Sequence, residues 1–455
     1  MMVRNPELQR NLWLEITAQR LLAVPAIGVL LAFAVGLGSK DQALALRVIG
    51  AAGFIGLTVL WGARLAGQAL TTEFLEGTWD GQRISGLSAW DMVCGKLLGG
   101  ASFAWYAGGW CLLGFLGGAV GRLGVADTLM AVFGLIALAV LTQALSLLSA
   151  LLNWRKLRRV TNTRRRGLGI LVVLTLMPWF AHIAELLSND VRYLIWFDRL
   201  WPMSKLLFVS VLLFAGWALL GAYRAMRVEL QFRNKPWPWI AFVVFLQIYC
   251  AGWINANAGQ TTAAIPYLPT ILIDTPVLRL LLATGIALSL AYLFLFAEPK
   301  DRSRFTRLIA DWRAQRRSNV LEALPLWLIN AAITVATAAL TLLITVTRAD
   351  ASTVIQIAAG TVAVLLYAVR DFTLVLWCNL SGIQRRADAA AAVYLTVLYG
   401  VLPLIFWSAN WHVLIGLVQP YSAFLNPVWL LTAAIWAAAG ADFFRRRWRH
   451  TSPAD

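Results

Sequence analysis

The sequence predicts an all-α, polytopic integral membrane protein with about twelve transmembrane helices and both termini in the cytoplasm. Of its 455 residues, 60% are hydrophobic and only 13% are charged, whereas a soluble domain carries about 25% charged residues. Apolar runs of about 18 residues or more recur along the whole chain, and each is long enough to cross the hydrocarbon layer as a helix. Basic residues gather between alternate pairs of these runs, as they do in cytoplasmic loops.

The apolar runs define the order of the predicted elements. The crossings are expected at residues 21–38, 47–71, 97–121, 127–151, 168–187, 204–222, 238–255, 276–296, 325–346, 354–379, 389–408 and 427–441. The corresponding domains are an interfacial amphipathic helix (1–20), a first six-helix half (21–222), a cytoplasmic linker (223–237), a second six-helix half (238–441) and a basic cytoplasmic tail (442–455).

The distribution of basic residues supports this layout. With the N-terminus inside, thirty of the 39 Lys and Arg residues fall in cytoplasmic segments, eight fall on the opposite side, and Arg64 lies within a crossing. Positive charge in short loops is retained on the cytoplasmic side, so both termini are expected there. The same loops explain the net charge of +17. They are expected to contact the lipid bilayer through its anionic headgroups, and no nucleic-acid partner is expected.

Residue types that carry catalysis are scarce. Four cysteines, Cys94, Cys111, Cys250 and Cys378, lie far apart without metal-ligand spacing, and the chain has three histidines. No Ser-His-Asp set, paired-carboxylate site or Gly-x-x-x-x-Gly-Lys-[Ser/Thr] phosphate loop occurs. The sequence therefore predicts that the chain is not an enzyme and holds neither a metal nor a cofactor of its own.

One segment between the second and third crossings has a different composition. Residues 73–96, EFLEGTWDGQRISGLSAWDMVCGK, combine both signs of charge with glycines and two tryptophans. Glu73, Glu76 and Asp80 are spaced three and four apart, which predicts one acidic face on a helix that extends the second crossing. Ser88, with Asp91 three residues on, predicts the N-cap of a new helix. A plain connector needs only two to eight residues, so this segment is either a long helix-turn-helix connector or a docking surface for a partner.

The segment resembles the cytoplasmic motif of the permease subunits of type-two ABC exporters. In that family a glutamate is followed by Gly-Thr, an apolar stretch, a short Pro-Leu-Ser turn and Gly-Lys at the third crossing. The matching positions are Glu73, Glu76, Gly77, Thr78, Leu87, Ser88, Gly95 and Lys96. Gly86 stands where the family has proline, which leaves the turn conformation open. The N-terminal stretch NPELQRNLWLEITAQR also fits the interfacial helix that precedes the first crossing in this family.

The resemblance covers residues 5–222 and implies a function. It implies a permease subunit of an ATP-driven exporter in a bacterial-type inner membrane, with ATP and Mg²⁺ bound by a separate ABC ATPase subunit. The implied coupling residues are Glu73, Glu76, Gly77, Thr78, Trp79, Asp80, Ser88, Asp91, Gly95 and Lys96. A twelve-helix secondary transporter and a membrane-embedded enzyme or scaffold are the alternatives, since twelve crossings host many functions. Substrate identity, direction of transport and copy number stay open.

Two alignments of the second half with the first compete. The first pairs Glu73, Phe74 and Trp79 with Asp371, Phe372 and Trp377, and the second pairs WPMS (201–204) with QPYS (419–422). Under the first alignment, residues 370–388 form a second coupling surface with Asp371, Trp377, Arg385 and Arg386. Under the second, the basic stretch 302–317 takes that role. Two surfaces would make the chain a single-chain pseudo-dimer, and one would require a homodimer; whether the halves arose by duplication stays open.

Few polar residues fall within the crossings. Arg64, Gln68, Gln143 and Asn330 are candidates for the lining of a translocation path, because polar side chains in a membrane face protein or a cavity. A carrier coupled to protons or sodium would bury more ionisable groups, so the path is expected to be apolar and to suit a hydrophobic or amphipathic substrate. The outer segments 188–205 and 408–427 are rich in aromatic residues and are expected either to form re-entrant interfacial helices or to belong to a simple aromatic belt.

Overall fold

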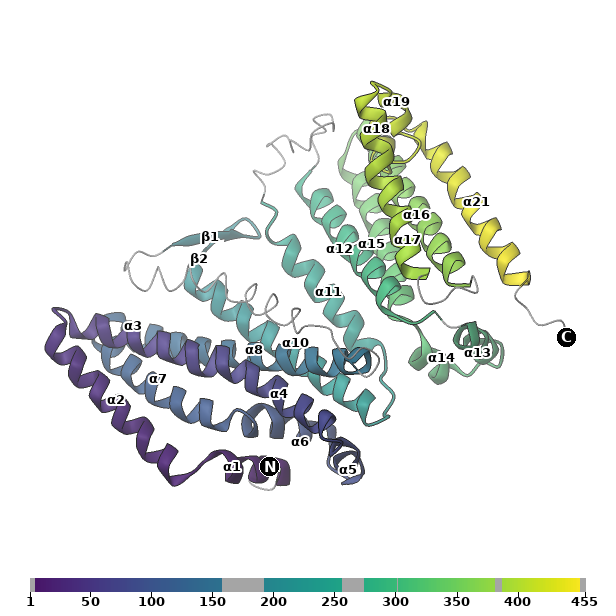
Figure 1. Ribbon diagram of the computed structural model, residues 1–455. Helices are drawn as coiled ribbons and strands as arrows, with labels where there is room; N and C mark the ends of the chain where they lie inside the picture. The colour runs from purple at the N-terminus through teal and green to yellow at the C-terminus, as the bar shows by residue number, and fades with distance from the viewer. Residues whose placement is uncertain (1–4, 158–191, 256–273, 301, 381–386, 451–455) are drawn as a thin grey trace. The chain divides into compact units, whose positions relative to one another are not determined.

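The computed structural model describes residues 5–157, 192–255, 274–300, 302–380 and 387–450 (Figure 1). The chain divides into two compact units, Met1–Leu194 with Leu200–Asn234 and Ile195–Arg199 with Lys235–Asp455. The division after Asn234 falls inside the range 223–237 expected as a linker, but helix α10 continues through Glu229.

The described part of the first unit is helical apart from its share of one hairpin. Its elements are α1 (Pro6–Glu15), α2 (Ala18–Gly38), α3 (Gln42–Phe54), the π-helix η2 (Ile55–Trp61), α4 (Gly62–Leu75), α5 (Trp79–Ile84), α6 (Ala89–Cys94), the π-helix η3 (Gly95–Gly99), α7 (Ser102–Leu123), α8 (Val125–Leu157), the strands β1 (Tyr193–Trp196) and β2 (Arg199–Pro202), and α10 (Met203–Glu229).

The second unit, which also includes the tip of that hairpin, contains the remaining helices. They are α11 (Trp237–Ala251), α12 (Thr275–Ala297), α13 (Arg302–Arg313), α14 (Arg317–Ala323), α15 (Leu326–Arg348), α16 (Ala351–Leu380), α17 (Ala387–Thr396), the π-helix η6 (Val397–Val401), α18 (Leu402–Ser408), α19 (His412–Ile415), α20 (Ser422–Leu425) and α21 (Trp429–His450).

The prediction of an all-α polytopic membrane protein is confirmed. In the described residues, nine helical segments are long and apolar enough to cross a membrane, and each coincides with one of the predicted crossings. Helix α11 is apolar but has only 15 residues. Helix α21 runs without a break from the expected crossing 427–441 through the arginines of the expected tail to His450. The remaining crossing, 168–187, lies outside the described residues, so the total of twelve stays a prediction.

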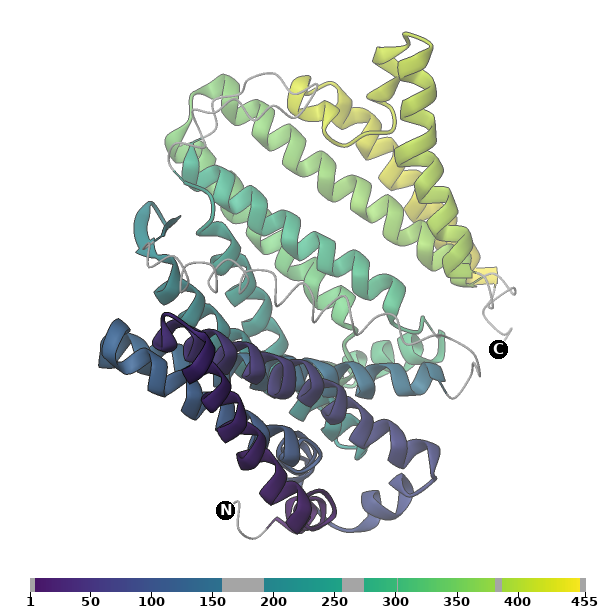
Figure 2. The same ribbon diagram turned by 60° about the vertical axis from the view of Figure 1, so that its left-hand side comes forward.

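Close helix packing in the first unit depends on glycine. Helices α3 and α7 lie side by side, as do α8 and α10 (Figures 1 and 2). A Cβ at Gly118 would lie 2.3 Å from the backbone oxygen of Ala43 and 2.9 Å from the backbone nitrogen of Arg47. A Cβ at Gly50 would lie 2.5 Å from the backbone nitrogen of Phe115. The two backbones therefore approach each other at a distance that only glycine permits, as small residues allow in membrane helices.

This contact gives a direct test of the packing. Gly118→Val is expected to destabilise the first unit by about 1–3 kcal/mol, because the new side chain meets backbone atoms that can give way only if the helices separate. Gly117→Val is the matched control, since a Cβ at the adjacent position meets nothing within 4 Å. Thermal unfolding of both variants in the same detergent measures the difference, and equal melting temperatures would contradict the packing.

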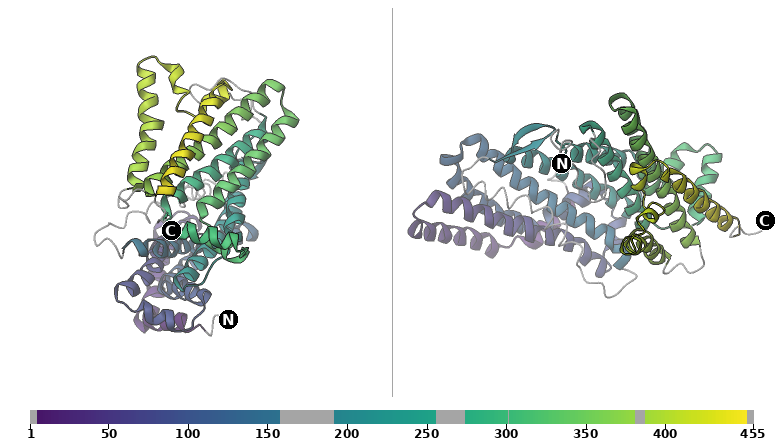
Figure 3. Two further views of the ribbon diagram at one scale, coloured as in Figure 1. Left: turned by 90° about the vertical axis from the view of Figure 1, so that its right-hand side faces the viewer. Right: turned by 90° about the horizontal axis from the view of Figure 1, so that it is seen from above.

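Two helix pairs organise the second unit. Helices α12 and α15 run side by side (Figure 2), and the light-green α16 lies beside the yellow α21 (Figure 3, left). The buried cores between them include Ala291, Leu295 and Phe372 in one cluster and Ala363 and Ala433 in another. Alanines are frequent in both clusters, as is common where helices pack in a membrane.

The expected re-entrant helix at 188–205 is wrong for its described part, residues 192–205. Residues 193–202 form the β1–β2 hairpin, whose two loop residues Phe197 and Asp198 have φ of 48° and 59°. Two consecutive left-handed residues are the geometry of a two-residue hairpin turn, which matches the twist of the strands. Within the second unit, the Trp196 Nε1–H donates to the backbone oxygen of Tyr249 at 3.2 Å. In 408–427 the structure has only the short helices α19 and α20, joined by turns.

Candidate functional site

The 73–96 segment is a compact hairpin of two short helices at one end of the first unit (Figure 1). Helix α4 ends at Leu75, and Gly77 (φ 73°) and Gly86 (φ 72°) bracket α5. Both glycines adopt the left-handed conformation, which costs residues with a Cβ more than glycine. Proline, with φ locked near −65°, does not fit at Gly86 in this conformation. The departure from the Pro-Leu-Ser pattern is therefore matched by a different turn.

The hairpin corrects one prediction and confirms another. Glu73, Glu76 and Asp80 do not share one helical face, because Gly77 ends the helix between them. Glu73 points into the unit, whereas Glu76 and Asp80 are exposed. The prediction for Ser88 is confirmed: its Oγ accepts the backbone N–H of Asp91 at 3.1 Å and caps α6. The Asp91 carboxylate in turn accepts the Ser88 hydroxyl at 2.6 Å.

A buried ionic cluster holds the base of the hairpin. The Lys96 side chain is wholly buried, and its ammonium pairs with the Glu73 carboxylate, which is 11% exposed. The same Nζ donates to Gln82 Oε1 at 3.2 Å and to Glu7 Oε1 at 3.4 Å. Gln82 Nε2 donates to Glu73 Oε1 at 2.6 Å. Lys96 and Glu73 thus compensate each other's charge, which a buried ammonium or carboxylate requires.

Helix α1 supplies the other wall of this cluster. Arg10 Nη2 lies 3.0 Å from Glu73 Oε1 and 3.2 Å from Glu7 Oε1. Asn5 caps α1 by accepting the backbone N–H groups of Glu7 and Leu8, while its Nδ2 donates to the backbone oxygen of Asp91 at 2.7 Å. The cap side chain therefore joins the start of α1 to α6.

Two glycines allow α1 to pack closely against η3. A Cβ at Gly95 would lie 2.4 Å from Glu7 Cγ, and a Cβ at Gly99 would lie 2.8 Å from Asn11 Cβ. Asn11 Nδ2 donates to the backbone oxygen of Gly95 at 3.3 Å. The Gly-Lys pair at 95–96 thus has a physical reason in this chain. The glycine lets Glu7 approach, and the lysine next to it, together with Arg10, balances the charges of Glu7 and Glu73.

The residues expected to couple to an ATPase separate into two sets. Glu76, Gly77, Thr78, Asp80 and Ser88 are exposed, and Asp91 is half-buried. Glu73, Trp79, Gly95 and Lys96 are buried. Trp79 packs on Phe74, with ring centroids 4.8 Å apart, and belongs to the hydrophobic core of the hairpin. In this conformation, the buried set supports the hairpin from inside and only the exposed set can meet a partner.

The exposed side of the hairpin, residues 75–88, is called the hairpin tip below. It presents Leu75 and Ile84, which are 75% and 82% exposed, beside the charged side chains of Glu76, Asp80 and Arg83. The Asp80 and Arg83 charges lie 3.9 Å apart at the surface. Exposed aliphatic residues among charges of both signs, on a rigidly held base, are suited to a contact that is oriented by charge and stabilised by apolar burial.

Among the described residues, no group of three or more His, Cys, Asp or Glu side chains could hold a metal ion. Burial, with a smaller contribution from Asp91, raises the pKa of the Cys94 thiol, which disfavours its nucleophilic thiolate form. The polar side chains here are occupied in holding helices together.

A second polar cluster lies inside the second unit. Asp371 is fully buried and accepts hydroxyl hydrogen bonds from Tyr292 and Tyr399, each at 2.6 Å. Arg370 Nε donates to Asp371 Oδ1 at 2.8 Å. The Arg370 guanidinium carbon lies 4.7 Å from the ring centroid of Tyr367, 5.1 Å from that of Tyr399 and 5.7 Å from that of Trp436. Three aromatic faces and one carboxylate therefore surround this cation.

The burial of Asp371 bears on residues 370–388, the second predicted coupling surface. Asp371 has no exposed surface in this structure with which to meet an ATPase, and Trp377 is half-buried. Arg385 and Arg386 lie outside the described residues. The competing stretch 302–317 spans α13 and the start of α14 and is largely exposed.

The candidate path residues have different environments. Gln143 is buried, donates to the backbone oxygen of Thr58 in η2 at 3.0 Å and accepts the Trp105 Nε1–H at 3.1 Å. A π-helix departs from the regular α-helical hydrogen-bond ladder, and Gln143 donates to one of the backbone oxygens of this π-helix. Its hydrogen bonds therefore connect helices of the first unit. Asn330 is also buried and accepts the Trp239 Nε1–H at 3.0 Å. Gln68 is half-buried, and Arg64 is exposed on α4.

Local sequence patterns missed several members of the hairpin cluster. Glu7, Arg10, Asn11 and Gln82 all contact it, but α1 lies 63 to 89 residues from its partners in the chain. The Asn-Pro pair at the start of α1 is a sequence signal for an N-cap. No local sequence signal indicates that α1 packs on η3.

Comparison of the chain with protein-family models, with curated proteins and with solved structures finds no match.

Proposed function

We propose that the chain is the permease subunit of an ATP-binding-cassette exporter, with the hairpin tip as the docking surface for a separate ATPase subunit. In this proposal the chain crosses a bacterial-type inner membrane twelve times with both termini in the cytoplasm. It moves a hydrophobic or amphipathic substrate, while ATP and Mg²⁺ are bound by the partner.

One observation carries the proposal: a mixed-charge hairpin tip is held rigidly by a buried ionic cluster. In this proposal, a conformational change of the ATPase must be passed on to the membrane helices, and a flexible loop would transmit it poorly. Residues 73–96 are suited to this role because they form a packed hairpin. The hairpin joins α4 directly to η3, and Lys96 ties both to α1. The excess of basic residues in the predicted cytoplasmic loops supports the prediction that the same end faces the side where ATP is available.

The first test is identification of the partner. The full chain is purified in a mild detergent, and co-purifying proteins are tested for ATPase activity. Transport in vesicles that depends on ATP on the side of the hairpin tip supports the proposal. Labelling that finds the hairpin tip outside the cell would contradict it.

Charge reversal at the tip separates docking from folding. Glu76→Lys is expected to reduce ATPase retention at least about tenfold, or ~1.4 kcal/mol, because it places a like charge against a surface that complements a carboxylate. Its melting temperature is expected to stay that of the wild type, because Glu76 is exposed. Asp127→Lys, at an exposed acid in the first turn of α8, is the matched control. Full retention of the ATPase by Glu76→Lys would count against docking at the tip.

A secondary transporter is the second candidate function, because the structure buries an ion pair in the second unit. Arg370 and Asp371 are each less than 5% exposed and lie within the apolar helix α16. Buried ionisable residues in a membrane helix commonly mark ion or substrate pathways. Transport driven by an imposed ion gradient in vesicles without ATP would favour this candidate over the exporter.

A further inference from the structure

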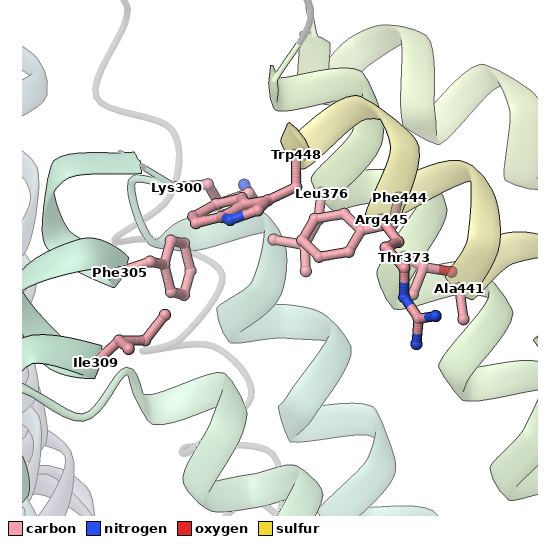
Figure 4. A pocket seen from close by; sticks show the side chains of 9 residues that line it. All are labelled: Lys300, Phe305, Ile309, Thr373, Leu376, Ala441, Phe444, Arg445 and Trp448. Carbon is pink, nitrogen blue, oxygen red and sulfur yellow. The ribbon is translucent and has the colours of Figure 1, made fainter. Parts of the chain in front are cut away.

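The second unit contains a pocket of about 490 Å³ bordered by α13, α16 and α21 (Figure 4). Its lining is mainly apolar: Phe305 and Ile309 come from α13, Leu376 from α16, and Phe444 and Trp448 from α21. The charged members are Lys300 and Arg445. The volume lies within the range of sites that hold small organic molecules.

The two charged lining residues differ in their burial. Lys300 is nearly fully buried, and its Nζ pairs with Asp388 Oδ1 at 2.7 Å. Arg445 is exposed, and the guanidinium carbon of Arg302, the first residue of α13, lies 5.0 Å from the ring centroid of Trp448. Arg445 therefore adds an exposed positive charge to a pocket whose walls are mainly aliphatic and aromatic.

Helix α13 has the composition of a helix that lies at a membrane surface. Phe305, Leu308, Ile309 and Trp312 recur at spacings of three and four, while the same helix carries four arginines and one aspartate. No residue of α13 is buried, and Trp312 is 72% exposed. Phe305 packs against the core of the second unit, whereas Ile309 and Trp312 are exposed. Exposed apolar residues on a helix rich in arginine are typical of helices at the boundary of headgroups and acyl chains.

The end of α21 adds to the basic charge on the other side of the pocket. Residues 441–450 contain four arginines and one aspartate, and Trp448 and Phe444 point into the pocket among them (Figure 4). Basic groups near a membrane surface attract anionic lipid headgroups, each contributing about 1 kcal/mol. The pocket thus combines an apolar interior with a cationic mouth.

We propose that this pocket binds one anionic phospholipid of the surrounding bilayer. An acyl chain fills the apolar space between Phe305, Leu376 and Phe444, and the phosphate lies at the mouth with Arg445. Charge complementarity selects this occupant: a zwitterionic lipid offers the same acyl chain but carries a cation toward the arginines. Because α13 and α21 both line the pocket, the bound lipid would hold them together.

The test uses the full chain, delipidated in detergent and titrated with phosphatidylglycerol or with phosphatidylcholine of the same acyl chains, followed by native mass spectrometry. We expect one tightly bound phosphatidylglycerol and weaker binding of phosphatidylcholine. Arg445→Gln is expected to weaken phosphatidylglycerol binding about fivefold, the factor that corresponds to ~1 kcal/mol for one basic residue, and to leave phosphatidylcholine binding unchanged. Arg449→Gln, an exposed arginine on the same helix that does not line the pocket, is the matched control.

A second pair of variants tests the pocket itself. Ala441→Trp places an indole in the pocket from an exposed lining position, and it is expected to abolish the tight site. Ala438→Trp, on the same helix and also exposed but outside the lining, is expected to bind like the wild type. If Ala441→Trp does not fold, Ala441→Leu replaces it and is expected to weaken binding.

Three outcomes would overturn the proposal. These are equal affinities of the wild type for the two lipids, undiminished phosphatidylglycerol binding by the Ala441 variant, and displacement of the lipid by millimolar inorganic phosphate. The last outcome would mean that the arginines bind a free anion and that the apolar pocket contributes nothing.

Discussion

Lys96→Met is expected to destabilise the first unit by about 3–5 kcal/mol, the cost of leaving a buried charge without its partner. Methionine nearly preserves the volume of the lysine stem but removes the ammonium that lies among Glu73, Glu7 and Gln82. Glu73 retains only the partly exposed Arg10 as a cationic neighbour. The expected result is a markedly lower melting temperature and faster proteolysis within residues 73–96.

Controls for this variant come from the same segment. Arg83→Met removes an exposed positive charge from the hairpin tip and is expected to change stability by less than about 0.5 kcal/mol. The double variant Lys96→Met with Glu73→Gln is expected to recover part of the loss, since neutralising both partners removes the uncompensated charge. A melting temperature of Lys96→Met equal to that of the wild type would contradict the buried ionic cluster.

The result also decides how functional variants of this segment are interpreted. Loss of transport in a Lys96 or Glu73 variant would reflect an altered hairpin base, because neither side chain is exposed enough to meet a partner. Only variants of exposed residues such as Glu76 report on docking. Stability must therefore be measured alongside every change in this segment.

Asp371→Asn is expected to destabilise the second unit by a similar amount, about 3–5 kcal/mol. The amide keeps an acceptor for the hydroxyls of Tyr292 and Tyr399, but it removes the counter-charge of Arg370. The aromatic rings around Arg370 offset part of the loss, as cation–π contacts do in a desolvated site. Thermal unfolding in detergent measures the effect.

An exposed ion pair is the control for this second variant. Asp442 pairs with Arg446 at 2.7 Å, and both side chains are at least 50% exposed, so Asp442→Asn is expected to cost no more than about 1 kcal/mol. If Asp371→Asn unfolds normally but abolishes transport driven by an ion gradient, the buried pair serves transport and the secondary transporter becomes the better assignment. If stability and transport both persist, the pair contributes to neither.

Local patterns in the sequence were sufficient for the helices and for some of their ends. Nine predicted crossings coincide with helical segments because length and apolar composition are properties of each run by itself. Ser88 was predictable as an N-cap because its partner Asp91 lies three residues away. The left-handed φ values of Gly77 and Gly86 were not predictable from the sequence.

Tertiary structure alone decided which polar residues are inside. Glu73, Glu76 and Asp80 have the spacing of one helical face, yet the turn at Gly77 sends the first inward and the other two outward. Lys96 and Asp371 were both predicted as coupling residues, a role that requires exposure to a partner. Each was buried by helices that arrive from 60 to 90 positions away: α1 brings Glu7 to Lys96, and α12 brings Tyr292 to Asp371.

The sequence by itself therefore determined the class of protein, most of the membrane helices and the place of the hairpin, because these depend on apolar length, capping and glycine over a few turns. The three-dimensional fold decided which of its charges support the hairpin and which face outward. That choice depends on the partner that each charge meets when helices pack, and no local pattern encodes a contact between residues so far apart in the chain.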